Sequence, residues 1–176
     1  QSITVTTAGT FTVRVTDANG CQGTSAPVTT TINSNPTPSV TPDGPTVFCD
    51  GDSVVFTSSA ASSYLWSTGA TTQSITVFAS GNYSVTVTDA NGCEGASAPI
   101  AVTVNNNPTP TITAIGDIEF CDGDSVVLRS SVSSSYLWST GATTRAIKVY
   151  ASGEFSVTVT NASGCVGTSD TVNVVV

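Results

Sequence analysis

The sequence contains no histidine and no methionine, and only four of its 176 residues are lysine or arginine. Without histidine the chain lacks the commonest general base and the commonest zinc ligand, so most enzyme mechanisms are disfavoured. Four basic side chains cannot neutralise a phosphate backbone, which disfavours nucleic acid as a partner. No run of eighteen apolar residues occurs, so no membrane span is expected in this segment. We therefore expect a protein that is not an enzyme and that uses no cofactor.

Strong helix formers are also scarce, since leucine occurs three times and lysine once. Serine, threonine and valine together supply 80 residues, and β-branched side chains favour strands over helices. This composition excludes a helical bundle and disfavours a Rossmann-type α/β fold. The net charge is −8 although only 9% of residues are charged, so solubility must come from hydroxyl groups or from attached sugars. The expected fold class is all-β.

The chain repeats itself with an offset of 72 residues and no insertion or deletion. The recurring segments are CDGDSVVFTSS at 49–59 and CDGDSVVLRSS at 121–131, YLWSTGATT at 64–72 and 136–144, and TDANGC at 16–21 and 88–93, which becomes TNASGC at 160–165. Such a fixed period predicts tandem copies of one small domain.

This register divides the chain into five parts. Residues 1–33 are the C-terminal half of one repeat, 46–104 and 118–176 are complete repeats, and 34–45 and 105–117 are Pro-rich linkers. Proline fixes φ and cannot donate to a β ladder, so these linkers are expected to be short and stiff. Because the chain opens in mid-repeat, either it is a piece of a longer array, or another chain supplies the missing strands.

Apolar residues alternate within each repeat. In GNYSVTVTD at 81–89, Tyr83, Val85 and Val87 fall on one face, a period typical of half-buried antiparallel strands. Further strands are expected at 46–49, 53–58, 63–66, 73–78 and 97–104, separated by Gly, Asn and Asp turns. Six or seven short strands in about 60 residues predict a small immunoglobulin-like β-sandwich. Trp66 and Trp138, on the third strand of each complete repeat, are expected in the core.

The five cysteines follow the repeat. Each complete repeat holds a pair 44 residues apart, which predicts the disulfides Cys49–Cys93 and Cys121–Cys165 and leaves Cys21 with a partner outside the chain. A bridge of this loop length stabilises a small domain by about 4 kcal/mol in the chain-entropy model. It also implies an oxidising compartment. Metal binding by these cysteines is disfavoured because close CxxC pairs and histidine are both missing.

The ordered motifs C-D-G-D-S-V-V, Y-L-W-S-T-G-A-T-T, A-S-G-x-Y/F-S-V-T-V-T and G-C occur in both complete repeats. Together they resemble the immunoglobulin-like tandem repeats of large secreted surface proteins from Bacteroidota, which include gliding-motility adhesins exported by the type IX system. The resemblance covers nearly all of the chain except the linkers. It implies an extracellular, secreted or cell-surface protein in which most repeats serve as spacers.

Acidic loops form one candidate site. If Cys49 bonds Cys93, then Asp50, Asp52, Asp89 and Glu94 come near one pole of the sandwich and offer oxygen ligands to Ca²⁺. The alternative is turn chemistry, in which Asp and Asn side chains cap backbone groups. The next copy favours this alternative, because it retains only two of the carboxylates, Asp122 and Asp124.

Hydroxyl groups form a second candidate site. The segments that begin at Asp52, Asp124 and Asp170 match the Asp-Ser/Thr-aliphatic pattern that resembles the O-glycosylation signal of Bacteroidota, with acceptors Ser53, Ser125 and Thr171. The alternative is that each hydroxyl caps the end of a strand.

The favoured function is structural: a repeat segment of a long extracellular protein that acts as an adhesin stalk or as an extracellular filament. Its partners would then be neighbouring repeats or copies of the same chain, since the edge strands of open sandwiches pair readily. Two alternatives stay open. One is a module that binds surface glycans through exposed aromatics, of which Phe78 and its counterpart Tyr150 are the best candidates. The other is an accessory domain of a secreted hydrolase.

Overall fold

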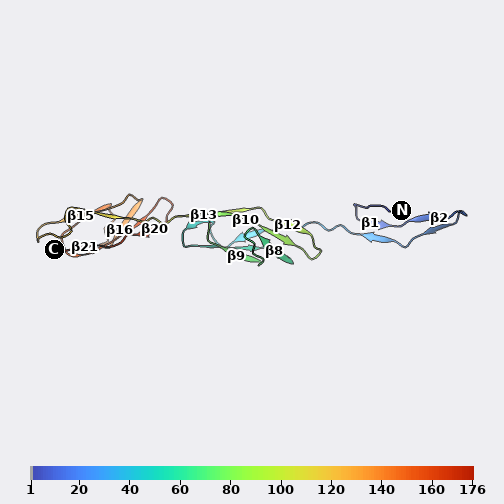
Figure 1. Ribbon diagram of the computed structural model, residues 1–176, viewed down its shortest axis with the longest axis horizontal. Coiled ribbons are helices and arrows are strands. Elements are labelled where there is room, and N and C mark those ends of the chain that lie inside the picture. Colours follow the sequence, from blue (N-terminus) through green and yellow to red (C-terminus); the bar gives the residue numbers. More distant parts are fainter. Residues whose placement is uncertain (1) are drawn as a thin grey trace.

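The chain is described by a computed structural model that covers residues 2–176, so Gln1 lies outside the described residues. Its regular structure is entirely β, and it forms three bodies that follow one another along a single long axis (Figure 1). We name them the half repeat (residues 2–33), the middle repeat (40–105) and the C-terminal repeat (112–176). None of the described residues belongs to a helix that could cross a bilayer.

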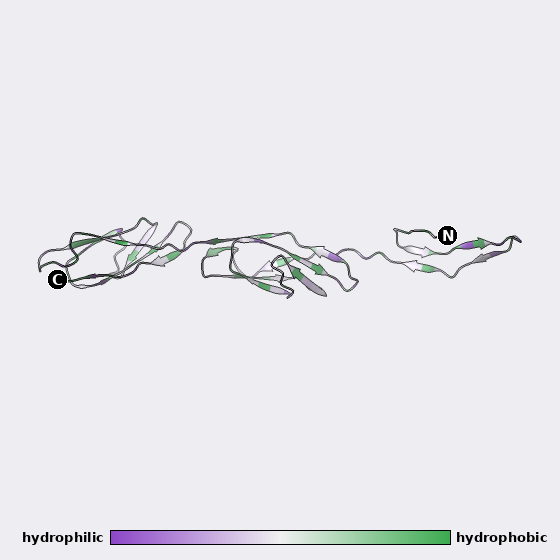
Figure 2. Ribbon diagram, viewed as in Figure 1, coloured by the Kyte–Doolittle hydropathy of each residue, from purple (hydrophilic) through white to green (hydrophobic). Residues whose placement is uncertain are grey.

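The middle repeat is a sandwich of nine short strands. They are β5 (Val40–Pro42), β6 (Val47–Cys49), β7 (Val54–Ser58), β8 (Ser63–Trp66), β9 (Ser74–Val77), β10 (Gly81–Tyr83), β11 (Val85–Thr88), β12 (Glu94–Ala96) and β13 (Ile100–Asn105). Three ladders of three strands result, in the orders β5-β7-β9, β10-β13-β6 and β12-β11-β8. Apolar and polar segments alternate along these strands (Figure 2), which is why each ladder buries one face only.

One ladder contains a parallel pair, β6 with β13, in which Val47 lies opposite Thr103 and Cys49 opposite Asn105. The other ladders are antiparallel, as the alternating pattern predicts. Because β6 and β13 run in the same direction, both end at the pole where the chain leaves the middle repeat. We call this the C-terminal pole of the repeat and the opposite end its N-terminal pole.

The C-terminal repeat has the same architecture. Its strands are β14 (Ile112–Ile115), β15 (Val126–Ser130), β16 (Ser135–Trp138), β17 (Ala146–Val149), β18 (Gly153–Phe155), β19 (Val157–Thr160), β20 (Val166–Thr168) and β21 (Val172–Val174). A parallel bridge between Glu119 and Val175 takes the place of the β6–β13 pair. The two complete repeats thus confirm the expected all-β class and the tandem sandwiches.

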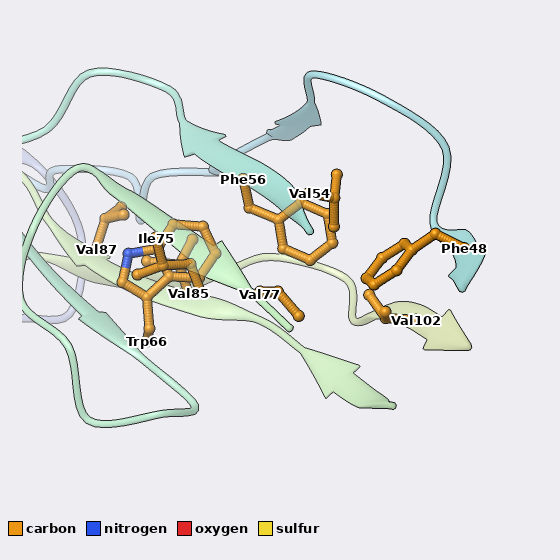
Figure 3. Packing of buried hydrophobic residues seen from close by; sticks show 9 residues of the cluster. All are labelled: Phe48, Val54, Phe56, Trp66, Ile75, Val77, Val85, Val87 and Val102. Atoms are coloured by element: carbon orange, nitrogen blue, oxygen red, sulfur yellow. The ribbon is translucent and has the colours of Figure 1, made fainter. Parts of the chain in front are cut away.

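Each complete repeat closes its own core. In the middle repeat nine side chains pack between the layers (Figure 3): Phe48, Val54, Phe56, Trp66, Ile75, Val77, Val85, Val87 and Val102. Trp66 is buried and donates its Nε1–H to the carbonyl of Thr72 at 2.8 Å. Trp138 makes the equivalent bond to Thr144, also at 2.8 Å. The core position expected for both tryptophans is therefore confirmed, and their polar edge is satisfied.

The linkers are shorter than the proline content predicts. Residues 40–42 of the expected linker 34–45 form β5, and residues 112–115 of the expected linker 105–117 form β14. Both strands lie at the edge of their ladder, where a proline such as Pro42 is tolerated because one side of the strand has no partner. The segments left as connectors are 34–39 and 106–111.

The half repeat consists of four strands, β1 (Gly9–Phe11), β2 (Arg14–Thr16), β3 (Gln22–Thr24) and β4 (Val28–Thr30). They form two separate ladders of two strands, β1-β4 and β2-β3. These correspond, 72 residues later, to the β10-β13 and β11-β12 pairs of the middle repeat. The structure therefore shows the back half of one sandwich, as the repeat register predicts.

Candidate functional site at the junction between repeats

The disulfide of the chain joins two different repeats. Cys49 at the end of β6 bonds Cys165 of the C-terminal repeat, 116 residues away, with a Cα–Cα distance of 5.5 Å. Cys21, Cys93 and Cys121 are free thiols. The predicted pairs Cys49–Cys93 and Cys121–Cys165 are therefore wrong.

The poles of the sandwich explain the difference. Cys49 ends a strand that runs beside β13, so it lies at the C-terminal pole, where the amide of Asp50 donates to Asn105 O at 2.8 Å. Cys93 lies at the N-terminal pole, where its thiol is 4.0 Å from Asn33 O. A bond between Cys49 and Cys93 would have to run the length of the sandwich, far beyond the reach of a disulfide.

A recurring loop holds the second cysteine of each repeat. In the middle repeat, Asp89 Oδ1 accepts the backbone N–H of Asn91 at 2.8 Å and that of Cys93 at 2.9 Å. In the C-terminal repeat the amide oxygen of Asn161 accepts the N–H of Cys165 at 3.0 Å. A side-chain oxygen that mimics a backbone turn fixes the cysteine in the same orientation in both repeats.

These bonds also perturb the carboxyl group. The N–H of Cys93, assisted by the N–H groups of Asn91 and Gly92, lowers the pKa of Asp89 below its ordinary value, against a smaller opposing effect of desolvation. Hydrogen bonds that favour the charged form of a carboxyl have this effect.

Two glycines permit the linkers to dock on these loops. A Cβ at Gly95 would lie 1.8 Å from the carbonyl oxygen of Pro36, and one at Gly167 would lie 1.8 Å from that of Pro108. No side chain fits in that space, so the glycines are required by close backbone approach. Gly23, the counterpart in the half repeat, has only a side-chain atom of Val15 near it, at 3.9 Å.

The second junction is tied from both sides. The side-chain amide of Asn107 donates to Asp50 O of the middle repeat at 2.8 Å, and that of Asn161 donates from the C-terminal repeat to Asn106 O at 3.0 Å. Cys165 is 1% exposed and its sulfur lies 3.8 Å from Asn105 O. The connector is thus enclosed by hydrogen bonds, a glycine contact and a disulfide.

The calcium candidate is not assembled. Asp50 and Asp52 lie at the C-terminal pole of the middle repeat, whereas Asp89 and Glu94 lie at its N-terminal pole. Within residues 2–176 no three side chains of Asp, Glu, Cys or His are grouped so as to hold a metal ion. The proposed site depended on the Cys49–Cys93 bond and fails with it, while Asp89 acts in a turn, as the alternative interpretation holds.

The remaining candidate residues lie on the surface. Ser53 and Thr171 are exposed and Ser125 is half-buried, and their glycosylation stays a prediction. Phe78 and Tyr150 are 64% and 60% exposed, as their assignment to an aromatic binding surface requires. The ammonium group of Lys148 lies 5.1 Å from the centroid of the Tyr150 ring, a cation–π contact on the same surface.

Sequence reasoning missed the glycines and prolines of the junction. The signal was present, because the pattern Gly-Cys-x-Gly occurs at 20–23, 92–95 and 164–167. A glycine that returns in three copies at a strand position marks close backbone approach. The disulfide spacing was also available, since 116 equals the expected separation of 44 plus one repeat of 72.

No family model matches the chain, and no curated protein does so at a significant level. Solved structures give remote similarities. The chain is similar at 13% identity and a TM-score of 0.38 to a chain of the mouse coronavirus receptor-binding domain complexed with its murine receptor, with 78% of this chain and 100% of that chain covered. Fibronectin(III)-like modules of Clostridium thermocellum CbhA match at 14% identity and 0.37, covering 78% and 94%. The human OSCAR ligand-binding domain matches at 14% and 0.34, covering 81% and 100%.

Proposed function

We propose that the chain is a segment of an extracellular structural rod, which serves as a stalk or a filament, and that its junctions limit bending. The observation that carries this proposal is the Cys49–Cys165 bond, which connects two sandwiches that each close their own core. A bond of this kind adds little to the folding of either sandwich. Its effect is to restrict how one moves relative to the other.

The physical argument concerns the number of connections. Two folded domains joined by a single six-residue connector sample many orientations. A second covalent connection across the same junction removes most of that freedom, and the contact of Pro108 with Gly167 fixes the connector itself. Because the chain enters each complete repeat at one pole and leaves at the other, braced repeats extend in a line (Figure 1).

Several features support an extracellular setting for this rod. A disulfide that persists between domains needs an oxidising environment. No lysine or arginine occurs between Arg14 and Arg129, so trypsin-like proteases have no cleavage site over that stretch. The resemblance to Bacteroidota surface repeats points the same way, and the type IX export of such proteins belongs to the proposal.

The rod is tested by small-angle X-ray scattering on the chain and its double variant Cys49→Ser/Cys165→Ser. We expect the variant to lose the scattering of a stiff rod and to show a broader distribution of distances. Cys121→Ser, which removes a free exposed thiol, is the matched control and should leave the curve unchanged. Identical curves for all three proteins would contradict the proposal. Electron microscopy of native material separates single strings, expected of a stalk, from ordered fibres.

The exposure of Phe78 and Tyr150 favours one second function, glycan binding. Flat aromatic rings spaced one repeat apart along a rod can stack on successive sugars of a polysaccharide. The variant Phe78→Ala/Tyr150→Ala should then lose retention on immobilised polysaccharide. Leu65→Ala/Leu137→Ala, which truncates equally exposed apolar residues elsewhere, is the control. If both variants are retained as well as the unmodified chain, glycan binding through these rings is refuted.

A further inference from the structure

We propose that the half repeat is an acceptor for a separate front-half segment of this same repeat, a peptide of the kind formed by residues 40–66, and that the cysteine of the bound segment pairs with Cys93. We call the front half the strands β5 to β8, or their counterparts in another repeat. The inference does not rest on the rod function, because it concerns how one sandwich is completed.

The first observation is an uncovered apolar face. Ile3 is 80% exposed, whereas its counterpart Ile75 in the middle repeat is 9% exposed. Val13 is 59% exposed, and its counterpart Val85 is 1% exposed. We define the acceptor face as Ile3, Val5, Phe11, Val13, Val15 and Val28. In the middle repeat the counterparts of these side chains face the front half, which supplies Phe56 and Trp66 to the shared core.

The second observation is a set of open strand edges. In the middle repeat, β7 pairs with β9, β8 with β11, and β6 with β13, so the front half supplies one strand to each ladder. In the half repeat β2 and β4 each have a partner on one side only. Residues 2–5, the counterpart of β9, form no strand. Two-stranded ladders are marginal by themselves, and open edges accept further strands.

The third observation is the shape of the face. A groove of about 240 Å³ lies between Ile3, Val5, Phe11, Val13 and Val28. In the middle repeat the ring of Phe56 meets the ring of Tyr83 edge to face, with centroids 5.9 Å apart. Phe11 is the counterpart of Tyr83, so a bound front half would place the counterpart of Phe56 against Phe11. Figure 2 shows that this body carries apolar strand segments like those of the complete repeats.

The fourth observation is the cysteine register. The front cysteine of one repeat, Cys49, bonds the rear cysteine of the next, Cys165. Cys93 is the rear cysteine of the repeat that follows the half repeat, and its sulfur lies 4.0 Å from Asn33 O, as that of Cys165 lies 3.8 Å from Asn105 O. A front half bound to the half repeat therefore brings its own cysteine beside Cys93.

The occupant is a separate segment because the front halves within the chain are engaged. Residues 40–66 and 112–138 each pair with the rear half of their own repeat. In the bond-forming step two thiols lose two protons and two electrons to a disulfide oxidant. Oxidised glutathione accepts both and yields two molecules of reduced glutathione.

The experiment adds a synthetic peptide of residues 38–66 to the variant Cys21→Ser/Cys121→Ser, in which Cys93 is the one remaining free thiol. We expect a 1:1 complex, a blue shift of the peptide tryptophan as it becomes buried, and, in a glutathione redox buffer, a covalent adduct at Cys93 identified by mass. The further variant Cys93→Ser should keep the complex and lose the adduct.

Peptide variants give a test that cannot unfold the chain. Phe56→Asp in the peptide should weaken the complex by roughly 100-fold, since it places a charge in the core. Thr57→Asp, at an exposed position of β7, should bind as well as the parent peptide, because it faces away from the core. On the chain, Val13→Asp should abolish binding, whereas Thr10→Asp should not, since its counterpart Asn82 is exposed in the complete repeat.

Three outcomes would overturn the proposal: no complex at micromolar peptide, equal binding of both peptide variants, or an adduct that forms without regard to Val13. A chain that dimerises through the half repeat, loses the dimer on Val13→Asp and ignores the peptide would identify the acceptor face as a self-association surface instead.

Discussion

Cys49 and Cys165 are 116 residues apart in the chain, and their disulfide spans the junction between two sandwiches. The bond leaves the cores independent, since the middle repeat buries Trp66 in one cluster and the C-terminal repeat buries Trp138 in another. Stability within a repeat and orientation between repeats are therefore determined by different residues. Each can be altered without the other.

The pairing of the cysteines predicts how many thiols the chain exposes. With Cys49 and Cys165 bonded, Cys21, Cys93 and Cys121 remain free, so alkylation of the unreduced chain in denaturant should add three labels. Reduction beforehand should raise the number to five. Pairing within each repeat would instead leave one thiol, and a single label on the unreduced chain would refute the junction disulfide. Mass spectrometry of the intact protein reads the count directly.

The docking of the connector predicts a position-dependent effect of alanine. Gly167→Ala should displace Pro108 from the second junction, because its Cβ would lie 1.8 Å from a carbonyl oxygen that cannot move freely. The result should be a more flexible rod in scattering and a Cys49–Cys165 bond that is reduced faster by dithiothreitol.

Gly23→Ala is the matched control, since the same substitution in the half repeat meets only a side-chain atom at 3.9 Å. Its rod stiffness and reduction rate should equal those of the unmodified chain. Equal effects of the two substitutions would show that glycine is needed for the hairpin itself and not for the connector.

The sequence predicted the sandwich because the local signals agree. Alternation in the segment around Val85 and Val87, glycine turns and two tryptophans all specify the same strands, and the structure buries these side chains. The direction of β6 could not be derived in this way. Alternation determines which face of a strand is buried, but it does not distinguish parallel from antiparallel pairing. The parallel pairing of β6 with β13 places Cys49 at the junction, and the disulfide and calcium predictions failed for that one reason.

The loop around Asp89 predicts a response to acid in one repeat only. Its pKa is lowered in the folded chain by the N–H of Cys93, so the stabilising contribution is present above the unfolded value of about 3.9 and is lost as pH falls through the folded pKa. In NMR spectra we expect the amide signals of Asn91 and Cys93 to shift below about pH 4. The amide of Cys165 should stay unchanged, because its acceptor, Asn161, is neutral. Asp89→Asn should abolish the shift, and a shift that persists in this variant would assign it to another group.

The exposed hydroxyls at Ser53 and Thr171 predict modification of native material. The intact mass of protein from its natural source should exceed the polypeptide mass, and the excess should fall in Ser53→Ala and Thr171→Ala. Ser125→Ala should have a smaller effect, since that side chain is half-buried. A native mass equal to that of the polypeptide would exclude glycosylation at all three positions.

The independence of the two cores predicts that Trp66→Ala destabilises one repeat alone. Removing a fully buried tryptophan costs about 3–5 kcal/mol and leaves the carbonyl of Thr72 without its donor. The variant retains Trp138 as its only tryptophan, so fluorescence reports the C-terminal repeat and far-UV circular dichroism reports the whole chain. In urea, dichroism should gain an early transition while the fluorescence midpoint stays within error of its original value. Leu65→Ala, one residue away and exposed, should produce no early transition. If fluorescence and dichroism instead shift together, the junction transmits stability between repeats, and the bond between Cys49 and Cys165 does more than restrict their orientation.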